Sequence, residues 1–181
     1  GKGALDANTT GNGNNAFGLD SLGAATTADS NAAFGHETLL VNTTGDDNTA
    51  IGTEALKANT TASNNTAVGY QCLVANTEGA QNTAFGNFTM HDNTLSSRNA
   101  SFGYNSLSKL NHTTATNGYN TAVGFQAGSD ITTGVQNTAI GALTFNATTA
   151  ASNNTACGYG VLNANTTGTD NVGVGSQALV S

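Results

Sequence analysis

A 17-residue repeat limits the folds open to this chain more than any other feature of its sequence. An Asn-Thr-Ala-apolar-Gly segment recurs throughout, and its glycines follow one another at intervals of 17 residues, with one interval of 21. These glycines are Gly18, Gly35, Gly52, Gly69, Gly86, Gly103, Gly124, Gly141, Gly158 and Gly175. A unit of 17 residues cannot bury a core by itself, so neighbouring units must stack and cover one another.

The period divides residues 1–181 into a single repeat domain of about 10.6 coils. Each repeat is numbered here from its Asn, as position 1. A partial coil covers 1–13, full coils start at 14, 31, 48, 65, 82, 99, 120, 137 and 154, and a partial coil covers 171–181. The longer interval places a four-residue insertion within 108–119. We expect this insertion to form an outward loop, because the motif resumes in register at Asn120.

Composition favours a polar, regularly hydrogen-bonded structure. Leu, Ile, Val and Phe make up 32 of 181 residues, about 18%, below the ~20% at which a packed globular core becomes doubtful. Only 8% of residues are charged and proline is absent, which argues against a disordered chain. A 17-residue unit is too short for a pair of helices and suits one coil of a β-solenoid. We therefore predict an all-β, parallel β-solenoid (β-roll), uncapped at both ends.

Within each coil, positions 1–5 predict a short strand, because β-branched and aromatic residues lie at its centre. Positions 7–10 are interpreted as a second strand or a single helical turn, and the Asn-Thr-Thr-Gly of positions 12–15 as a turn. Since neither end of the chain carries a cap, we expect the ends to be covered by other protein. That protein is either a longer parent chain or identical subunits stacked head to tail.

Position 1 is Asn in every copy, which predicts an internal ladder of side-chain amides that bond the next coil or a turn backbone. The ladder residues are Asn14, Asn31, Asn48, Asn65, Asn82, Asn99, Asn120, Asn137, Asn154 and Asn171. The alternative is that these residues form surface turns.

Positions 3 and 4 lie on opposite faces of the predicted strand. Position 4 is always apolar and position 3 is almost always Ala, as in Ala16, Ala33 and Ala50, so both faces resemble buried ones. We expect position 4 to fill the core of its own coil and the Ala column to pack against a partner chain. In the alternative, the Ala column faces the core and position 4 is partly exposed.

The two cysteines, Cys72 and Cys157, lie five coils apart at different repeat positions. Five coils span roughly 24 Å, and a disulfide needs Cα atoms within about 7 Å. We predict that the two do not pair and that both are small core residues.

No pattern in the sequence predicts a catalytic, cofactor-binding or metal-binding site. His36, His91 and His112 occupy different places in the repeat and form no column, so we do not expect an enzyme. The net charge is −7, and the four basic residues are scattered, which argues against nucleic acid as a partner. No stretch reaches the ~18 apolar residues of a membrane helix, so we expect no membrane insertion.

Aromatic side chains at position 6 follow the glycine turn and are candidates for a contact surface: Tyr70, Tyr104, Phe125 and Tyr159. Stacked rings can bind the faces of sugars, although such rings more often cover an edge or pack between protomers. Lys109 and His112 in the insertion are further candidate contact residues, because the insertion is the only break in the repeat.

The run Asn65-Thr66-Ala67-Val68-Gly69-Tyr70-Gln71-Cys72-Leu73, with parallels at 48–56 and 154–162, resembles the YadA-like head repeats of trimeric autotransporter adhesins. It is also similar to repeat arrays of phage tail fibres. The resemblance covers essentially the whole chain. It implies a left-handed parallel β-roll with three chains side by side, and a role in adhesion or as a fibre shaft.

Three functions follow as hypotheses. The first is a structural subunit or segment of an extracellular fibre or filament, built by stacking and lateral association of identical solenoids. The second is an adhesin or tail-fibre shaft on a cell surface or virion that binds surface glycans. The third is ice binding. Two features argue against it: the Thr-Thr pairs lie in turns, and they vary between coils, as at Glu78 and Leu95.

Overall fold

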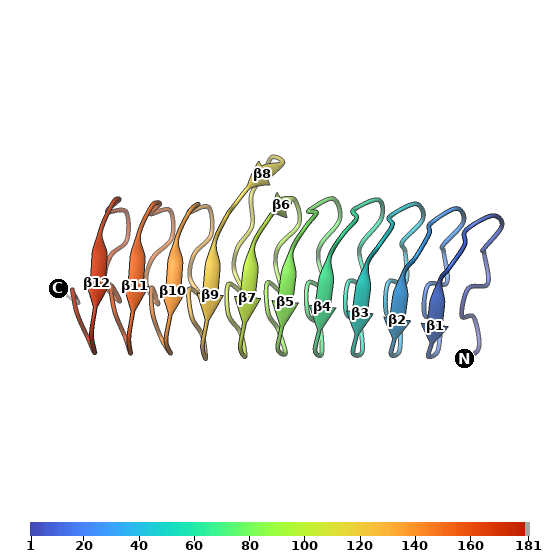
Figure 1. The fold of residues 1–181 in the computed structure, drawn as a ribbon, viewed down its shortest axis with the longest axis horizontal. Helices are drawn as coiled ribbons and strands as arrows, with labels where there is room; N and C mark the ends of the chain where they lie inside the picture. Colours follow the sequence, from blue (N-terminus) through green and yellow to red (C-terminus); the bar gives the residue numbers. More distant parts are fainter. Residues whose placement is uncertain (180–181) are drawn as a thin grey trace.

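The computed structural model describes residues 1–179 and shows a β-solenoid whose coils stack along one long axis (Figure 1). The three-residue strands of successive coils form one ten-stranded parallel sheet, and a short pair, β6 and β8, lies beside it. The predicted all-β parallel solenoid is therefore confirmed. The strands are β1 (Asn15–Phe17), β2 (Ala32–Phe34), β3 (Thr49–Ile51), β4 (Thr66–Val68), β5 (Thr83–Phe85), β6 (Ser96–Ser97), β7 (Ala100–Phe102), β8 (Thr116–Asn117), β9 (Thr121–Val123), β10 (Thr138–Ile140), β11 (Thr155–Cys157) and β12 (Val172–Val174).

The stacking register equals the repeat of the sequence. Thr49 of β3 pairs with Thr66 of β4, and the same shift of 17 residues holds between the other regular coils. Main-chain hydrogen bonds between coils continue outside the strands. The Leu56 N–H donates to Cys72 O at 3.0 Å, and the Thr43 N–H donates to Thr60 O at 2.9 Å. Each coil is thus held to its neighbours around much of its perimeter, as buried main-chain groups require.

The core lies between the inner face of the sheet and the opposite wall of each coil. Ala33, Ala50 and the other position-3 residues of β2 to β11 are fully or almost fully buried, as are most position-9 side chains, such as Leu56. The position-4 side chains point outward, and Phe85 is 39% exposed. The expectation that position 4 fills the core and that the Ala column packs on a partner is therefore wrong.

The small Ala side chain explains this inversion, because it lets the strand lie close to the opposite wall. The buried Ser21 hydroxyl donates at 3.1 Å to Ala33 O, in the strand of the next coil. With a Leu in most position-9 sites, a Phe at position 3 would not fit the remaining space, since protein interiors are close-packed. The large side chains of position 4 are thereby left on the outer face.

Positions 7–10 form neither of the two predicted structures. Positions 7 and 9 adopt left-handed backbone conformations, as at Gln71 (φ 51°) and Leu73 (φ 52°), and residues 1–179 contain no helix. Side chains other than Gly rarely adopt positive φ. Here the conformation turns the Leu73 side chain into the core while its N–H reaches Thr89 O at 3.0 Å in the next coil. None of the described residues belongs to a helix that could span a membrane.

Glycine at position 5 is required by close approach between coils. At Gly69, φ is 139°, and an added Cβ would lie 2.5 Å from the Gly86 carbonyl oxygen of the next coil. The other position-5 glycines from Gly18 to Gly158 face the same obstacle. The invariant glycine therefore sets how closely the coils can stack at the end of each strand.

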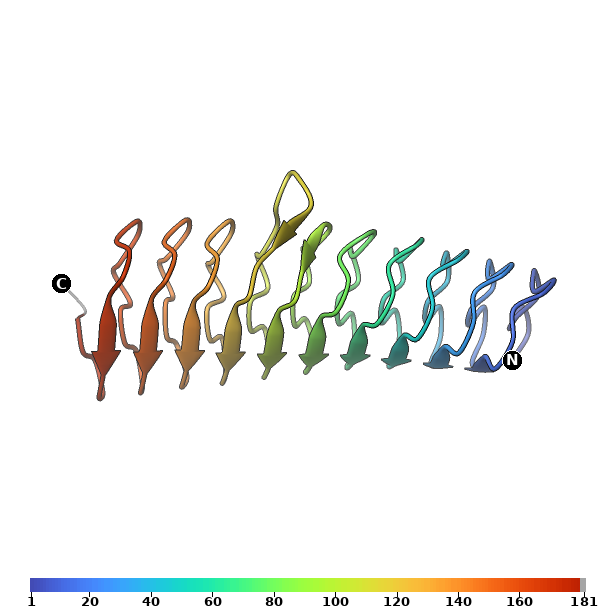
Figure 2. The same cartoon turned by 45° about the horizontal axis from the view of Figure 1, so that its top comes forward.

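The insertion projects from the solenoid as predicted. It rises beside β8 above the line of the other turns, and Thr113, Thr114 and Ala115 are exposed (Figures 1 and 2). Beneath it, β6 pairs with β8 and β7 pairs with β9, so the sheet continues without a break. The solenoid therefore accommodates four extra residues in one turn while the sheet keeps its register.

Candidate functional site

The outer face of the ten-stranded sheet carries an uninterrupted line of apolar side chains, called here the outer column. All but one of its members are exposed, and Val68 is half-buried. The outer column consists of Phe17, Phe34, Ile51, Val68, Phe85, Phe102, Val123, Ile140, Cys157 and Val174.

Neighbouring members of the outer column support one another. The rings of Phe85 and Phe102 stack with centroids 5.4 Å apart and planes 8° apart. Position 2, the other outward position of the strand, is Thr in six of the ten strands and is never charged. The outer face of the sheet therefore presents apolar and hydroxyl groups, with one amide at Asn15 and no charged side chain, which is unusual for a surface exposed to water.

The Asn side chains of position 1 form a ladder inside the coil. The Asn65 Oδ1 atom accepts from the Asn82 main-chain N–H at 2.9 Å, and the Asn65 Nδ2 group donates to Gly79 O at 2.9 Å. The first bond recurs at 2.9–3.1 Å in every consecutive pair from Asn14 to Asn171. Each amide thus pairs main-chain groups that the turn would otherwise leave buried without partners.

A second, shorter Asn ladder at position 12 was not anticipated. The Nδ2 groups of Asn59, Asn76 and Asn93 donate to the Oδ1 atom of the preceding Asn at 2.9–3.0 Å, beginning at Asn42. The Asn-Thr-Thr-Gly pattern by itself predicts only a turn at these residues. Their alignment over four coils was the signal for this ladder, which ends where Leu110 occupies position 12.

The predicted contact aromatics at position 6 are exposed at one edge of the coil. Tyr104 and Phe125 stack with centroids 5.6 Å apart. Tyr70 and Tyr104 each meet the ring of Phe88 edge-on, at 5.3 Å and 5.9 Å, so four aromatic rings form one cluster. Tyr159 stands apart, 52% exposed, two coils beyond Phe125. Sequence analysis missed Phe88, which occupies position 7, a site that is polar in most coils.

The two candidates in the insertion have different environments. Lys109 is exposed and its Nζ lies 2.7 Å from the Asp130 carboxylate in the next coil. His112 is 7% exposed, and its Nε2 atom lies 3.1 Å from Thr133 O. Lys109 is therefore open to a ligand, whereas the His112 imidazole is packed under the exposed loop and is not presented as a contact residue.

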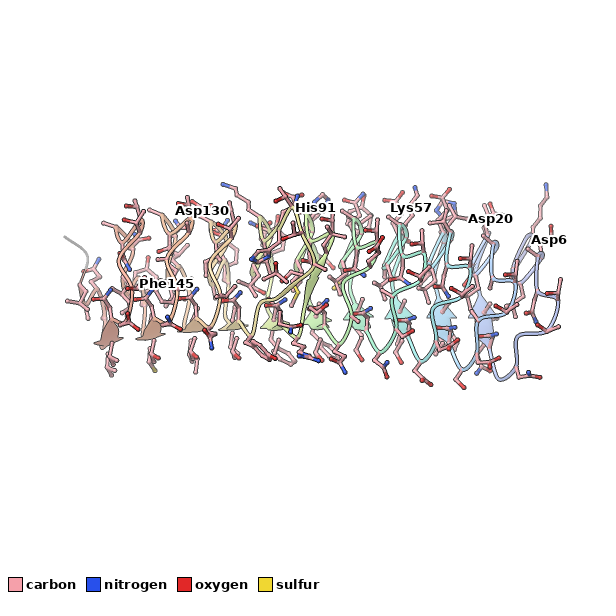
Figure 3. All side chains as sticks on the ribbon, turned by 90° about the horizontal axis from the view of Figure 1, so that it is seen from above. Asp6, Asp20, Lys57, His91, Asp130 and Phe145 are labelled. Carbon is pink, nitrogen blue, oxygen red and sulfur yellow. The ribbon has the colours of Figure 1, made fainter. Side chains whose placement is uncertain are left out.

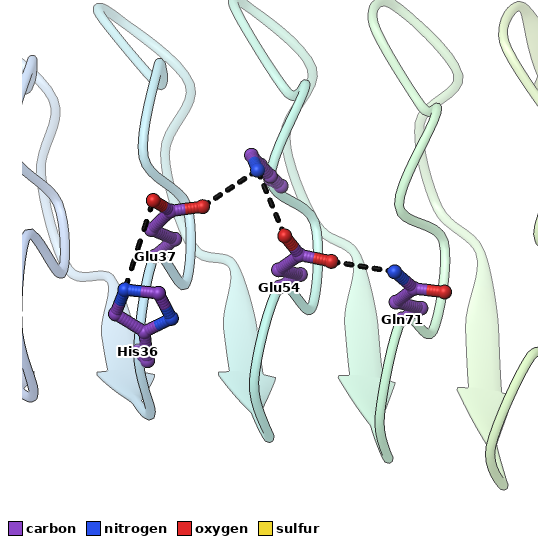
Figure 4. A network of polar contacts seen from close by, with 5 residues as sticks. His36, Glu37, Glu54 and Gln71 are labelled. Atoms are coloured by element: carbon purple, nitrogen blue, oxygen red, sulfur yellow. Dashed lines mark hydrogen bonds and ion pairs between the residues drawn. The ribbon is translucent and has the colours of Figure 1, made fainter.

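A line of charged and polar side chains crosses three coils near the position-7 corner (Figure 4). Lys57 Nζ lies 2.6 Å from Glu37 and 2.8 Å from Glu54, and Gln71 donates to Glu54 at 2.6 Å. His36 lies 3.6 Å from Glu37. The hydrogen bond to Glu37, followed by that to Glu54, raises the pKa of Lys57 to about 12. The hydrogen bond from Lys57 is the largest cause that lowers the pKa of Glu54.

The cysteines differ in a way that the sequence did not indicate. Cys72 is buried, and desolvation raises the pKa of its thiol to about 12. Cys157 is exposed in the outer column, so its assignment as a core residue is wrong. The coil of Cys72 contains β4, and Cys157 lies in β11, five strands further along the sheet, in agreement with the separation estimated from the repeat.

Titratable residues do not gather into a reactive site in the part of the chain that the structure describes. No group of three or more His, Cys, Asp and Glu side chains is placed to hold a metal ion there. The exposed groups that repeat from coil to coil are instead apolar, aromatic and hydroxyl side chains. No known protein family, curated protein or solved structure matches the chain.

Proposed function

We propose that this chain is a structural subunit or segment of an extracellular fibre or filament, built by stacking and lateral association of β-solenoids. The observation that carries the proposal is the outer column, a continuous exposed apolar line along the outer face of the sheet. Exposed apolar patches of this extent commonly mark surfaces that other protein covers.

A second copy of this chain is the partner that fits the outer column best. The column repeats once per coil, about every 4.8 Å. A partner with the same axial period can bring an apolar group against each rung, and this chain has that period. The face carries no charge at positions 2 and 4. Two copies packed through this face therefore bring no like charges together, although each chain has a net charge of −7.

The size of the face is also suitable. Ten strands extend about 43 Å along the axis, and two outward positions with their neighbours are about 15 Å wide. The resulting area is on the order of 600 Å² per partner, near the ~800 Å² per partner of a stable interface. Three copies arranged side by side, as the sequence resemblance implies, would cover the outer column of each chain.

Sedimentation velocity and negative-stain microscopy of the purified chain test the proposal. We expect discrete oligomers or filaments, together with a loss of association in the Phe85→Thr/Phe102→Thr variant. Thr suits an outward strand position because its β-branched side chain favours strands. A matched control, Leu19→Thr/Tyr159→Thr, removes two exposed apolar side chains outside the outer column and should associate normally. A chain that stays monomeric at high concentration would contradict lateral association.

The arrangement of the threonines argues against ice binding. The aligned position-13 hydroxyls are used in stacking, as when Thr43 donates to Thr60 O at 3.1 Å and Thr60 donates to Thr77 O at 3.2 Å. On the sheet, the position-2 threonines alternate with the projecting apolar side chains of the outer column and form no flat hydroxyl surface. We expect no thermal hysteresis from the purified chain.

A further inference from the structure

Two neighbouring hollows lie on the fourth to seventh full coils, close to the insertion. The first, called here the Phe88 hollow, has a volume of about 290 Å³. Its lining consists of Phe88, His91, Asp92, Asn105, Ser108 and Lys109.

The second hollow, called here the Thr94 hollow, has a volume of about 590 Å³ and shares Asp92 and Lys109 with the first. Its other polar lining residues are Thr94, Asn111 and Thr132. The two hollows therefore adjoin across the Asp92 and Lys109 side chains. Both hollows are shallow and open to solvent, so a ligand there would be only partly covered.

These coils depart from the repeat at the positions that line the hollows. Position 11 is Ala in several other coils, including Ala58, Ala75 and Ala147, but it is charged in three consecutive coils as Asp92, Lys109 and Asp130. Position 7 changes from Gln71 to Phe88 in the adjoining coil. These changes add contacts between coils, since Phe88 meets Tyr70 and Tyr104 edge-on and Lys109 pairs with Asp130. They also place aromatic and charged side chains together at one surface, and such local departures from a structural rule are typical of functional sites.

The lining combines an aromatic wall with hydrogen-bonding groups of both kinds. Phe88 is held edge-on by Tyr70 and Tyr104, so its ring is fixed in place. Asp92 contacts His91 at 2.7 Å and remains about half exposed, and Lys109 is 58% exposed while it contacts Asp130. Alternating acceptors and donors beside an aromatic ring suit a ligand with many hydroxyl groups and an apolar face.

Charge favours a neutral ligand. Within Asp92, Lys109 and Asp130, the single ammonium is already paired with a carboxylate, so no unpaired cation would attract an anionic ligand. Asp92 in turn contacts His91 at 2.7 Å, so both carboxylates already have a side-chain partner. The position-11 side of the coil also lies away from the sheet, as the labelled His91 and Asp130 show (Figure 3).

We propose that the Phe88 and Thr94 hollows together bind a neutral oligosaccharide of two or three pyranose rings. One ring lies against Phe88, and its hydroxyls bond Asp92, Asn105 and Lys109. The next ring lies in the Thr94 hollow beside Asn111. The proposal goes beyond the structural role and does not depend on it, because the outer column lies on another face.

Titration of the full chain with cellotriose, maltotriose and chitotriose, followed by ¹H–¹⁵N NMR, tests the proposal. We expect at least one of the three to shift the signals of Phe88, Asp92 and Lys109, with a Kd of about 1 mM because the hollows are open. Glucose or N-acetylglucosamine alone should bind about tenfold more weakly, since a single ring fills one hollow.

Substitutions toward the repeat keep the fold and remove the site. Phe88→Gln introduces the residue of the preceding coil and should weaken binding about tenfold, and Asp92→Ala should weaken it by a similar factor. Leu143→Gln introduces the same residue at position 7 three coils away and should leave binding unchanged.

Two outcomes overturn the proposal. One is the absence of signal shifts with all three trisaccharides at about 10 mM, ten times the expected Kd. The other is equal binding by the unsubstituted chain and Phe88→Gln. Sedimentation of the same variants separates this failure from a failure of lateral association, because Phe88→Gln leaves the outer column intact.

Discussion

The position-1 Asn column and the outer column recur with equal regularity along the chain, yet they occupy opposite environments. Each Asn from Asn31 to Asn154 is buried with its amide bonded to main-chain groups, whereas most of the outer column is exposed to solvent. The polar column is inside and the apolar column is outside, the reverse of a simple hydrophobic pattern. Repetition therefore indicates that the residue type at a position is constrained. It does not indicate whether that residue is required by packing inside the coil or by contact with a partner.

The largest effect is expected from the Asn column. Asn65→Leu keeps the size of the side chain but leaves the buried Asn82 N–H without its acceptor and removes the bond to Gly79 O. The free energy of unfolding should fall by about 2–4 kcal/mol, because a buried unpaired donor carries a desolvation penalty. Urea unfolding followed by circular dichroism measures this change. If Asn65→Leu lowers the unfolding free energy by less than Phe85→Thr does, the buried ladder is not the main source of stability among the two columns.

The position-12 ladder should be less costly to interrupt. Asn76→Leu removes the bonds to Asn59 and from Asn93, but Gly79 O keeps the Asn65 amide as a donor. Leu110 shows that the coil accepts Leu at this position. We expect a loss of about 1 kcal/mol in the same unfolding experiment.

The double variant Asn65→Leu/Asn76→Leu sharpens the difference between the two ladders. It removes both side-chain donors to Gly79 O, so the combined loss should exceed the sum of the single losses by about 1 kcal/mol. Strictly additive losses would show that the two ladders act independently.

For the outer column we expect a small effect on folding and a large one on association. Phe85→Thr loses the stacked contact with Phe102, which is worth about 0.5–1.5 kcal/mol beyond the apolar area that the ring buries. Because Phe85 is 39% exposed, the total loss of unfolding free energy should stay below about 2 kcal/mol. Sedimentation of the same sample reports association. A large loss of stability in a monomeric sample would indicate that the column serves the coil itself.

The smallest effect is expected at the Lys57 cluster. The folded-state pKa of Glu54 lies below its ordinary value of 4.5, mainly because Lys57 donates to it. Its contribution to stability is therefore present above the unfolded-state pKa and is lost as pH falls through the folded-state pKa. At pH 7, Glu54→Gln should cost less than about 1 kcal/mol, since the pair is partly solvated.

The pH dependence supplies the check on that prediction. The difference in unfolding free energy between Glu54→Gln and the unsubstituted chain should shrink as the pH is lowered below about 4.5. A difference that stays constant from pH 7 to pH 3 would assign the effect to packing and not to the charge of Glu54.

Much of the candidate site was present in the sequence as separate residues. Tyr70, Tyr104 and Phe125 were identified from their position after the glycine turn. Phe88 was not, because the pattern gave no reason to link position 7 of one coil with position 6 of its neighbours. The left-handed conformation at position 7 brings these rings together, and a backbone conformation of that kind leaves no propensity signal in Phe or Gln.

The sequence by itself determined the solenoid, its register and the location of its interruption. A 17-residue period, a Gly at position 5 and an Asn at position 1 admit few other arrangements, since short units must stack to be stable. Only the tertiary structure decided which columns face inward. The space between the two walls of the coil holds an Ala opposite the Leu of position 9, and the larger position-4 side chains are excluded from it. Which column faces inward depends on the distance between the strand and the wall that carries position 9. An alternating pattern along one strand cannot specify that distance.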